Sequence, residues 1–168
     1  MKKTNFKEDE VQMNAHSMGG TSQIADSCLL TAWLTPSLMN EMGLGQFSSS
    51  DLRKVMAGKM ASTGIGLSDD KDIVSGHCSP NDIEWLLQQI NLRFTAPRFD
   101  REAYNAYMAR VQTAIQFRSL NPDAAFGDSV NVMINNHHPR ALPISAARLS
   151  EMSFEKLEAI YRDRFADP

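Results

Sequence analysis

The segment Ser79-Pro80-Asn81-Asp82 constrains the fold of this chain more than any other. A hydroxyl side chain, then a proline at the first helical position, then a carboxylate near the third position are typical of a helix start. The segment therefore predicts a helix that begins at Pro80. Four apolar residues would form its inward face: Ile83, Leu86, Leu87 and Ile90.

The chain just before this helix start has the pattern of a β-hairpin. Lys59 to Leu67 and Lys71 to Cys78 are strand-like, and they flank Ser68-Asp69-Asp70, a polar turn of the right size to join antiparallel strands. Further upstream, Glu10 to Ser17 alternates between apolar and polar residues, which is the period of a half-buried strand. The sequence therefore predicts three strands.

Helical patterns fill most of the remaining chain. From Ile24 to Met42 the pattern is mostly apolar, and Pro36 should kink or break that helix. Further helical segments are expected at Asp51–Met56, from an Asp100 cap to Phe117, from Asn121-Pro122 to Asn135, as a short turn at Ser145–Leu149, and from Ser153 onward. Two of these have predicted inward faces: Ala103, Tyr104, Tyr107, Met108, Val111, Ala114 and Ile115 in the first, and Leu157, Ile160, Tyr161 and Phe165 in the last.

This order of elements predicts the α+β class, with an antiparallel sheet covered on one face by helices. The length of 168 residues suits one domain with a real core. We therefore expect a single domain over residues 1–168. Because three strands make a thin sheet, we also expect a fragment of a larger protein, truncated at both ends.

Composition excludes several classes of function. The formal charge of −3 is spread along the chain and forms no basic stripe, so nucleic acid is not an expected partner. No apolar run reaches the roughly 18 residues of a membrane span, so no membrane contact is expected. Cys28 and Cys78 are interpreted as small buried apolar residues, not as a disulfide or a thiolate zinc site.

Residues that often carry chemistry occur here without the partners they would need. His16 and His77 are isolated, and the adjacent pair His137-His138 has no nearby Asp, Glu or Cys to complete a metal site. No G-x-S-x-G elbow is present, and Gly64-Ile65-Gly66 is too short for a dinucleotide fingerprint. The sequence therefore names no catalytic, cofactor-binding or metal-ligating residue.

Two further groups of residues favour structural roles. Core packing is the favoured interpretation of six aromatic and methionine residues: Trp33, Trp85, Tyr104, Tyr107, Met108 and Met133. Arg93, Arg98 and Arg101 flank Phe94-Thr95-Ala96-Pro97 and would suit an acidic partner, although a solvated linker between helices is favoured.

Several stretches, in order, carry a resemblance to a known family. They are Phe6-Lys7-Glu8-Asp9-Glu10-Val11 leading to Met18-Gly19-Gly20-Thr21-Ser22, then Gly43-Leu44-Gly45-Gln46-Phe47-Ser48 with Asp51–Lys59, then Phe94–Asp100, then Tyr161-Arg162-Asp163-Arg164-Phe165. Together they span nearly the whole chain. In these stretches the chain resembles the insulinase/pitrilysin family of zinc metallopeptidases, in particular its large four-domain bacterial members.

The resemblance implies a metallohydrolase-like domain of the insulinase and mitochondrial processing peptidase type. In that family a His-x-x-Glu-His motif on one helix and a downstream Glu bind zinc. This sequence departs from the pattern, because Cys28–Thr35 contains no His or Glu and Tyr107–Ala114 contains no carboxylate. Such a departure is what the opening domain of the non-catalytic C-terminal half looks like.

The resemblance therefore implies a role inside a larger peptidase. The chain would form part of the wall of a peptide-enclosing chamber, with the other domains of the same polypeptide and the peptide substrate as partners. Zinc would be bound in the catalytic half of the parent, which would hydrolyse peptide bonds in the bacterial periplasm or cell envelope. This fragment alone would hold no cofactor and would not be an enzyme.

Three interpretations remain open from the sequence. The chain is either such a domain or a stand-alone helical protein-interaction module that shares these motifs. An enzyme with a site at His137-His138 is the third interpretation, and it requires tight zinc binding there.

Overall fold

The computed structural model describes residues 9–165. The resembling stretch that begins at Phe6 lies partly outside the described residues. Within them, the three strands are β1 (Val11–Met18), β2 (Ala61–Leu67) and β3 (Lys71–Cys78). The α-helices are α1 (Leu29–Met42), α2 (Ser49–Val55), α3 (Ile83–Thr95), α4 (Arg101–Ser119), α5 (Pro122–Ile134), α6 (Ala146–Ser150) and α7 (Phe154–Phe165). Four 3-10 turns join them: η1 (Gly20–Gln23), η2 (Asp26–Cys28), η3 (Pro80–Asp82) and η4 (Pro139–Ala141).

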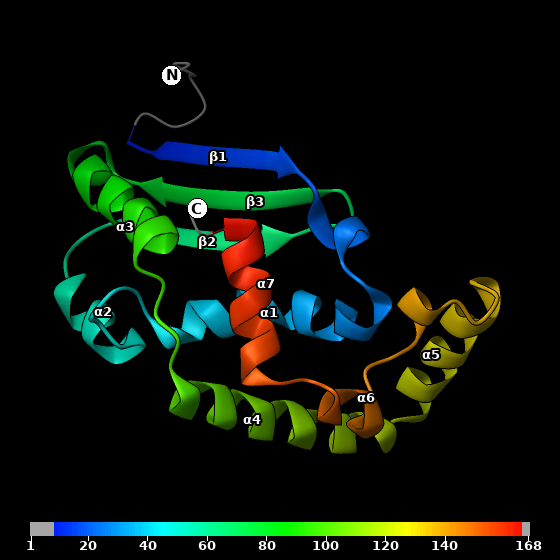
Figure 1. The fold of residues 1–168 in the computed structure, drawn as a ribbon. Helices are drawn as coiled ribbons and strands as arrows, with labels where there is room; N and C mark the ends of the chain where they lie inside the picture. Colours follow the sequence, from blue (N-terminus) through cyan, green and yellow to red (C-terminus); the bar gives the residue numbers. More distant parts are fainter. Residues whose placement is uncertain (1–8, 166–168) are drawn as a thin grey trace.

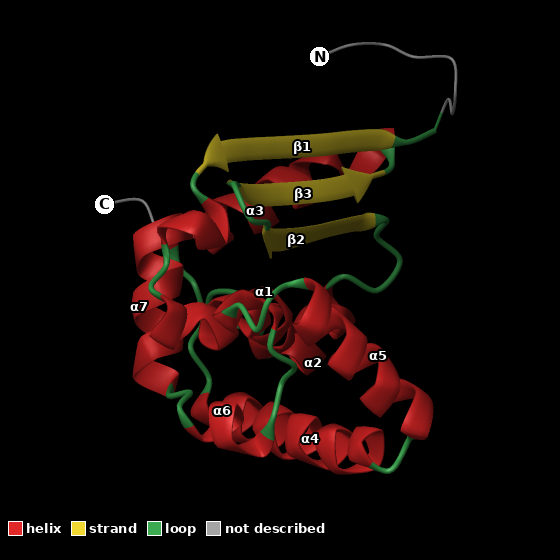
Figure 2. Ribbon diagram, turned by 90° about the vertical axis from the view of Figure 1, so that its right-hand side faces the viewer, coloured by secondary structure: helices red, strands yellow, loops and turns green. Residues whose placement is uncertain are grey.

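The sheet is antiparallel, with β3 between β1 and β2. Its register places Ile65 opposite Val74, and both side chains are buried in the main core. The same face continues to Cys78, which packs with Leu86 and Ile90 of α3. Because side chains alternate across a strand, this one face carries most of the apolar residues, and α1 and α3 lie against it, with α7 packed on α1 (Figures 1 and 2). The predicted α+β class with helices on one face is confirmed.

The main core is built by residues far apart in the chain. Tyr161 of α7 is fully buried, and its ring meets Phe99 edge to face at 5.7 Å between centroids. Tyr104 of α4 meets Phe154 in the same way at 5.5 Å. The α7 face predicted from the sequence is thus buried at Leu157, Tyr161 and Phe165 and half-buried at Ile160.

Local signals located most elements correctly. The hairpin and its turn lie where predicted, and Asp100 caps α4 by accepting hydrogen bonds from the Glu102 and Ala103 N–H groups, each at 3.0 Å. Asn121 caps α5 in the same way through the N–H groups of the next turn. These caps are short-range devices, so the sequence alone determines them.

Some boundaries differ from the prediction. Ile24 and Ala25 are extended, so the α-helix expected from Ile24 begins at Leu29, and it then runs through Pro36 without a break. Pro80 begins the 3-10 turn η3 instead of an α-turn, and the Ser79 hydroxyl donates to the Asp82 carboxylate instead of capping a backbone N–H.

Several predicted core positions are in fact exposed. On α3, Leu86 and Ile90 are buried, whereas Ile83 and Leu87 lie on the solvent side of the helix. Ala114 and Met133 are exposed, and Cys28 is half-buried. Trp85 is half-buried beneath the Lys59 ammonium, which lies 5.4 Å from the ring centroid. Where the side of a helix that packs against the core is narrower than its apolar side, some of the apolar residues are left exposed to solvent.

Arg93 is the largest departure from the prediction, which placed it in a solvated linker. Its side chain is buried, and the guanidinium donates to the Thr63 Oγ1 at 2.7 Å and to the Thr63 carbonyl at 2.6 Å. Its own carbonyl accepts a hydrogen bond from the Tyr161 hydroxyl at 2.8 Å. Arg93 therefore joins α3 to β2 and to α7.

Residues of the resembling stretches form tertiary contacts between segments that are far apart in the chain. The Gly20 N–H donates to the buried Asp72 carboxylate at 3.0 Å, and Arg164 forms an ion pair with the same carboxylate at 3.5 Å. Gly20 has a φ of +64°, and a Cβ there would meet the Ser68 carbonyl oxygen at 2.4 Å, so only glycine fits. The second stretch meets the third where the Gly45 N–H donates to the Ala96 carbonyl at 3.0 Å.

Arg93→Ala should lower the free energy of unfolding by about 3 kcal/mol, because it removes two charge-assisted hydrogen bonds and leaves a Thr63 carbonyl without its donor. Urea denaturation of the chain measures this. Arg101→Ala is the matched control, since that side chain is 61% exposed, and it should change stability little. Equal losses of stability in the two variants would contradict the role of Arg93 in joining α3 to β2.

Stability should also depend on Tyr161 at alkaline pH. Burial raises the pKa of Tyr161 to about 12, above the value of about 10 in an unfolded chain. The contribution of the protonated hydroxyl is present below pH 10 and is lost as the pH rises through 12. At pH 8, Tyr161→Phe should cost about 1 kcal/mol. Between pH 10 and 12 the wild type should lose up to about 3 kcal/mol more than the variant, and parallel curves would contradict this.

Candidate functional site

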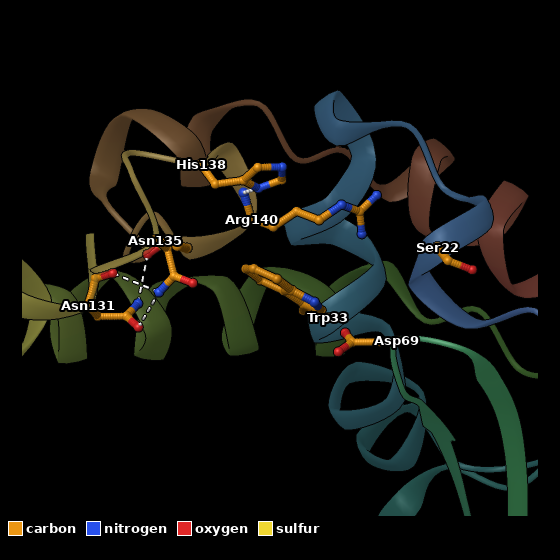
Figure 3. Close-up of a pocket in the computed structure, with 8 residues that line it drawn as sticks. Ser22, Trp33, Asp69, Asn131, Asn135, His138 and Arg140 are labelled. Carbon is orange, nitrogen blue, oxygen red and sulfur yellow. Dashed lines mark hydrogen bonds between the residues drawn. The ribbon is translucent and has the colours of Figure 1, made fainter. Parts of the chain in front are cut away.

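The hollow that holds His138 lies where η1, α1, α5, η4 and the β2–β3 turn meet. It encloses about 540 Å³. Figure 3 shows Arg140 reaching across it above the ring of Trp33, with Asn131 and Asn135 on the side of α5. The lining residues are Ser22, Trp33, Asp69, Asn131, Asn135, His138, Arg140 and Ala141.

The guanidinium of Arg140 binds groups of this same chain. Its guanidinium donates to the Thr21 and Ile24 carbonyls, each at 3.0 Å, and forms an ion pair with Asp26 at 3.2 Å. These contacts fix the segment between β1 and α1, which is 114 to 119 residues away in the sequence. Arg140 is therefore a structural clamp, which the sequence did not single out because two of its three partners are backbone carbonyls and all three are far away in the sequence.

The amides of α5 brace the other side of the hollow. Asn131 donates through Nδ2 to the Ala141 carbonyl at 2.9 Å, and Asn135 donates to the Asn131 carbonyl at 2.8 Å. The His138 Nδ1 accepts the Arg140 N–H at 3.2 Å, which caps η4. The polar lining thus holds η4 on α5.

The predicted metal candidates do not come together. His138 lines the hollow and its neighbour His137 does not. His16 lies on β1 and His77 on β3, where the His77 ring is within 3.3 Å of the Ser62 hydroxyl. Between residues 9 and 165, no three His, Cys, Asp or Glu side chains lie close enough together to hold a metal ion.

The two segments that the resemblance identifies with zinc-binding helices do pack together, since α1 contacts α4. Their side chains do not fit a zinc ion. Leu29, Leu30 and Ala32 are buried in α1, and the ion pair between Arg110 and Glu41 links the two helices. Apolar packing and one ion pair occupy this contact.

The shifted pKa values have structural causes. The Ala103 N–H, followed by Arg98, lowers the pKa of Asp100, and the Met60 N–H lowers that of Asp82. Burial raises the pKa of the Cys78 thiol. These groups lie at helix starts and in the core, outside the hollow.

A second hollow lies on the face of the sheet opposite the helices. It encloses about 430 Å³ and is lined by small and polar residues: Glu10, Gln12, Asn14, Ser62, Thr63, Gly64, Ser75, Gly76 and His77. No helix within residues 9–165 has the length and apolar character that crossing a bilayer requires.

No protein-family model and no curated protein sequence matches the chain. Solved structures do. The peptidase M16 inactive domain from Pseudomonas fluorescens is 17% identical with a TM-score of 0.74, and the match covers 91% of this chain and 38% of that one. The periplasmic protease PqqL from Escherichia coli is 18% identical with a TM-score of 0.75, covering 97% of this chain and 18% of that one.

The ferredoxin protease FusC, solved as a mutant in complex with Arabidopsis ferredoxin, is 20% identical with a TM-score of 0.69. That match covers 93% of this chain and 17% of the FusC chain. All three are insulinase/pitrilysin-type proteases, so the fold that the resemblance implied is confirmed. This chain spans less than two fifths of the length of each.

Arg140→Ala should loosen the segment that Arg140 clamps. The amide protons of Thr21, Ser22 and Ile24 should exchange with solvent roughly tenfold faster, because about 1.4 kcal/mol of local hydrogen bonding is lost. Hydrogen exchange followed by mass spectrometry measures this. Arg118→Ala, which removes an exposed ion pair with Asp128, is the control and should leave that segment unchanged. Unchanged exchange in both variants would show that Arg140 does not hold the segment.

Proposed function

We propose that this chain is a non-catalytic domain of a zinc metalloendopeptidase of the insulinase/pitrilysin type. It forms part of the wall of the chamber that encloses the peptide, and the catalytic half of the parent polypeptide binds zinc and cleaves the peptide bond. The observation that carries the proposal is the likeness to a peptidase M16 inactive domain over 91% of this chain.

The side chains of the described residues support this role. The segment Cys28–Thr35, which the resemblance aligns with a zinc-binding helix, is mostly buried, and Tyr107, Met108 and Val111 of the corresponding segment on α4 are half-buried against the core. In the hollow beside His138, the polar groups hold η4, α5 and η1 together. Such an arrangement suits a domain that contributes shape and rigidity.

The location of the parent is part of the proposal. PqqL is a periplasmic protease, and its structure contains the same fold over 97% of this chain. We place the parent in the bacterial periplasm or cell envelope, with a peptide or protein as substrate and with its remaining domains as the partners of this one.

Calorimetric titration of zinc and cleavage of a quenched peptide library test the proposal. The purified chain should neither bind zinc below micromolar concentration nor cleave the library. The complete polypeptide that carries it should cleave the library, and a chelator should abolish that activity.

Two outcomes would overturn the proposal. Cleavage by the isolated chain, lost in His137→Ala or His138→Ala, would place an active site at His137-His138, in the loop that precedes η4. A complete polypeptide that ends near Pro168 and cleaves nothing would favour the stand-alone interaction module.

A further inference from the structure

The helix α5 presents its large apolar side chains to solvent. Phe126 is 72% exposed, Met133 72% and Ile134 77%, and Val130 between them is half-buried. Their spacing of four, seven and eight residues from Phe126 places all four on one side of the helix. We call these four residues the α5 stripe. In Figure 1, α5 lies at the end of the molecule opposite α3.

The opposite side of α5 is polar and contacts the rest of the protein. Asp128 forms an ion pair with Arg118 of α4 at 2.6 Å, and Asn131 donates to the Ala141 carbonyl at 2.9 Å. The orientation of α5 is therefore the reverse of that of an ordinary amphipathic helix, because its polar side packs against the protein and its apolar side faces solvent. Large apolar side chains are exposed as a group on protein surfaces mainly where a partner covers them.

Gly127 gives an independent indication that a partner covers this part of α5. It lies inside α5, seven residues before Ile134, and a Cβ added there would meet no atom within 4 Å. A glycine within a helix is unfavourable compared with alanine, and nothing in the described fold requires one here. Glycine at such a position allows another backbone to approach the helix closely.

We propose that the α5 stripe is the surface on which another domain of the same polypeptide docks, through apolar side chains of its own. This inference rests on the proposed function, which places the chain inside a larger protein.

The size of the stripe favours a tethered domain over a separate molecule. Three large side chains, each of roughly 150–250 Å² and mostly exposed, present on the order of 400 Å². Each partner in a stable complex of separate proteins buries about 800 Å². Interfaces between domains of one chain start at about 600 Å² over both sides, since the covalent link keeps the partner at high effective concentration.

The lengths of the similar structures agree with this choice. This chain corresponds to 38%, 18% and 17% of the three chains that share its fold, so each of those chains has further protein beside the matched region. A docking surface toward such a region has its partner in the same molecule.

A photo-cross-linking residue tests the proposal in the complete polypeptide. p-Benzoylphenylalanine replaces Phe126, which it resembles in shape, and the protein is irradiated and analysed by denaturing gel and peptide mass spectrometry. The expected product is an internal cross-link from position 126 to peptides outside residues 1–168, at unchanged molecular mass. The same replacement at Asn105, an exposed polar position on α4, is the control and should give at least fivefold less.

Other occupants would give other products. A product of doubled mass would assign the stripe to a second copy of the protein, a cross-link formed only to added peptide would assign it to substrate, and a yield equal to that of the control would show that nothing covers it. Each of these results overturns the proposal. The proposed function fails separately, because an internal cross-link in a polypeptide that cleaves no peptide would leave the docking surface standing.

Gly127→Ala tests whether a partner backbone approaches α5 closely at this position, independently of its effect on the stability of the helix. In the isolated chain it should raise the melting temperature, because alanine favours the helix and the space around it is open. In the complete polypeptide it should lower the cross-link yield at position 126 several-fold. An unchanged yield would contradict close approach at Gly127.

Discussion

The buried guanidinium of Arg93 constrains the rest of the structure. A charge removed from water is tolerated only where hydrogen bonds replace its hydration, and Thr63 supplies both acceptors. One of them is a backbone carbonyl of β2, one of the two edge strands in the order β1-β3-β2. Because the Arg93 carbonyl also receives the Tyr161 hydroxyl, the position of α3 on the sheet and the position of α7 in the core are fixed by the same residue.

The stretches that resemble the insulinase/pitrilysin family have a common role at such contacts. Gly20 and Arg164, from the first and last stretches, meet at the carboxylate of Asp72 on β3. Gly45 and Ala96, from the two middle stretches, meet through a backbone hydrogen bond. The choice of amino acid at these positions is restricted by a close approach of the backbone or by a buried partner. The resembling stretches therefore coincide with contacts that hold the fold together, and they indicate architecture more than chemistry.

The sequence predicted those features whose causes are local. The hairpin around Asp69, the cap at Asp100 and the cap at Asn121 each depend on neighbours within a few residues, and each lies where it was expected. Arg93 was predicted wrongly because its acceptor at Thr63 is 30 residues away, and the clamp by Arg140 was missed because its acceptors are carbonyls at Thr21 and Ile24, which no side-chain pattern reveals. The hollow beside His138 could therefore be found in the structure alone.

Periodicity also leaves the direction of a helix face undetermined. The helix start at Asn121-Pro122 predicted α5 correctly, and the usual inference would turn the apolar face with Phe126, Val130 and Met133 inward. Here the contacts of Asp128 and Asn131 hold the polar side against the protein. Burying each large apolar side chain of the stripe would contribute roughly 1.5–3 kcal/mol. The apolar side of α5 is therefore a source of binding free energy that its own fold leaves unused, and a neighbouring domain is the partner to which its size is matched.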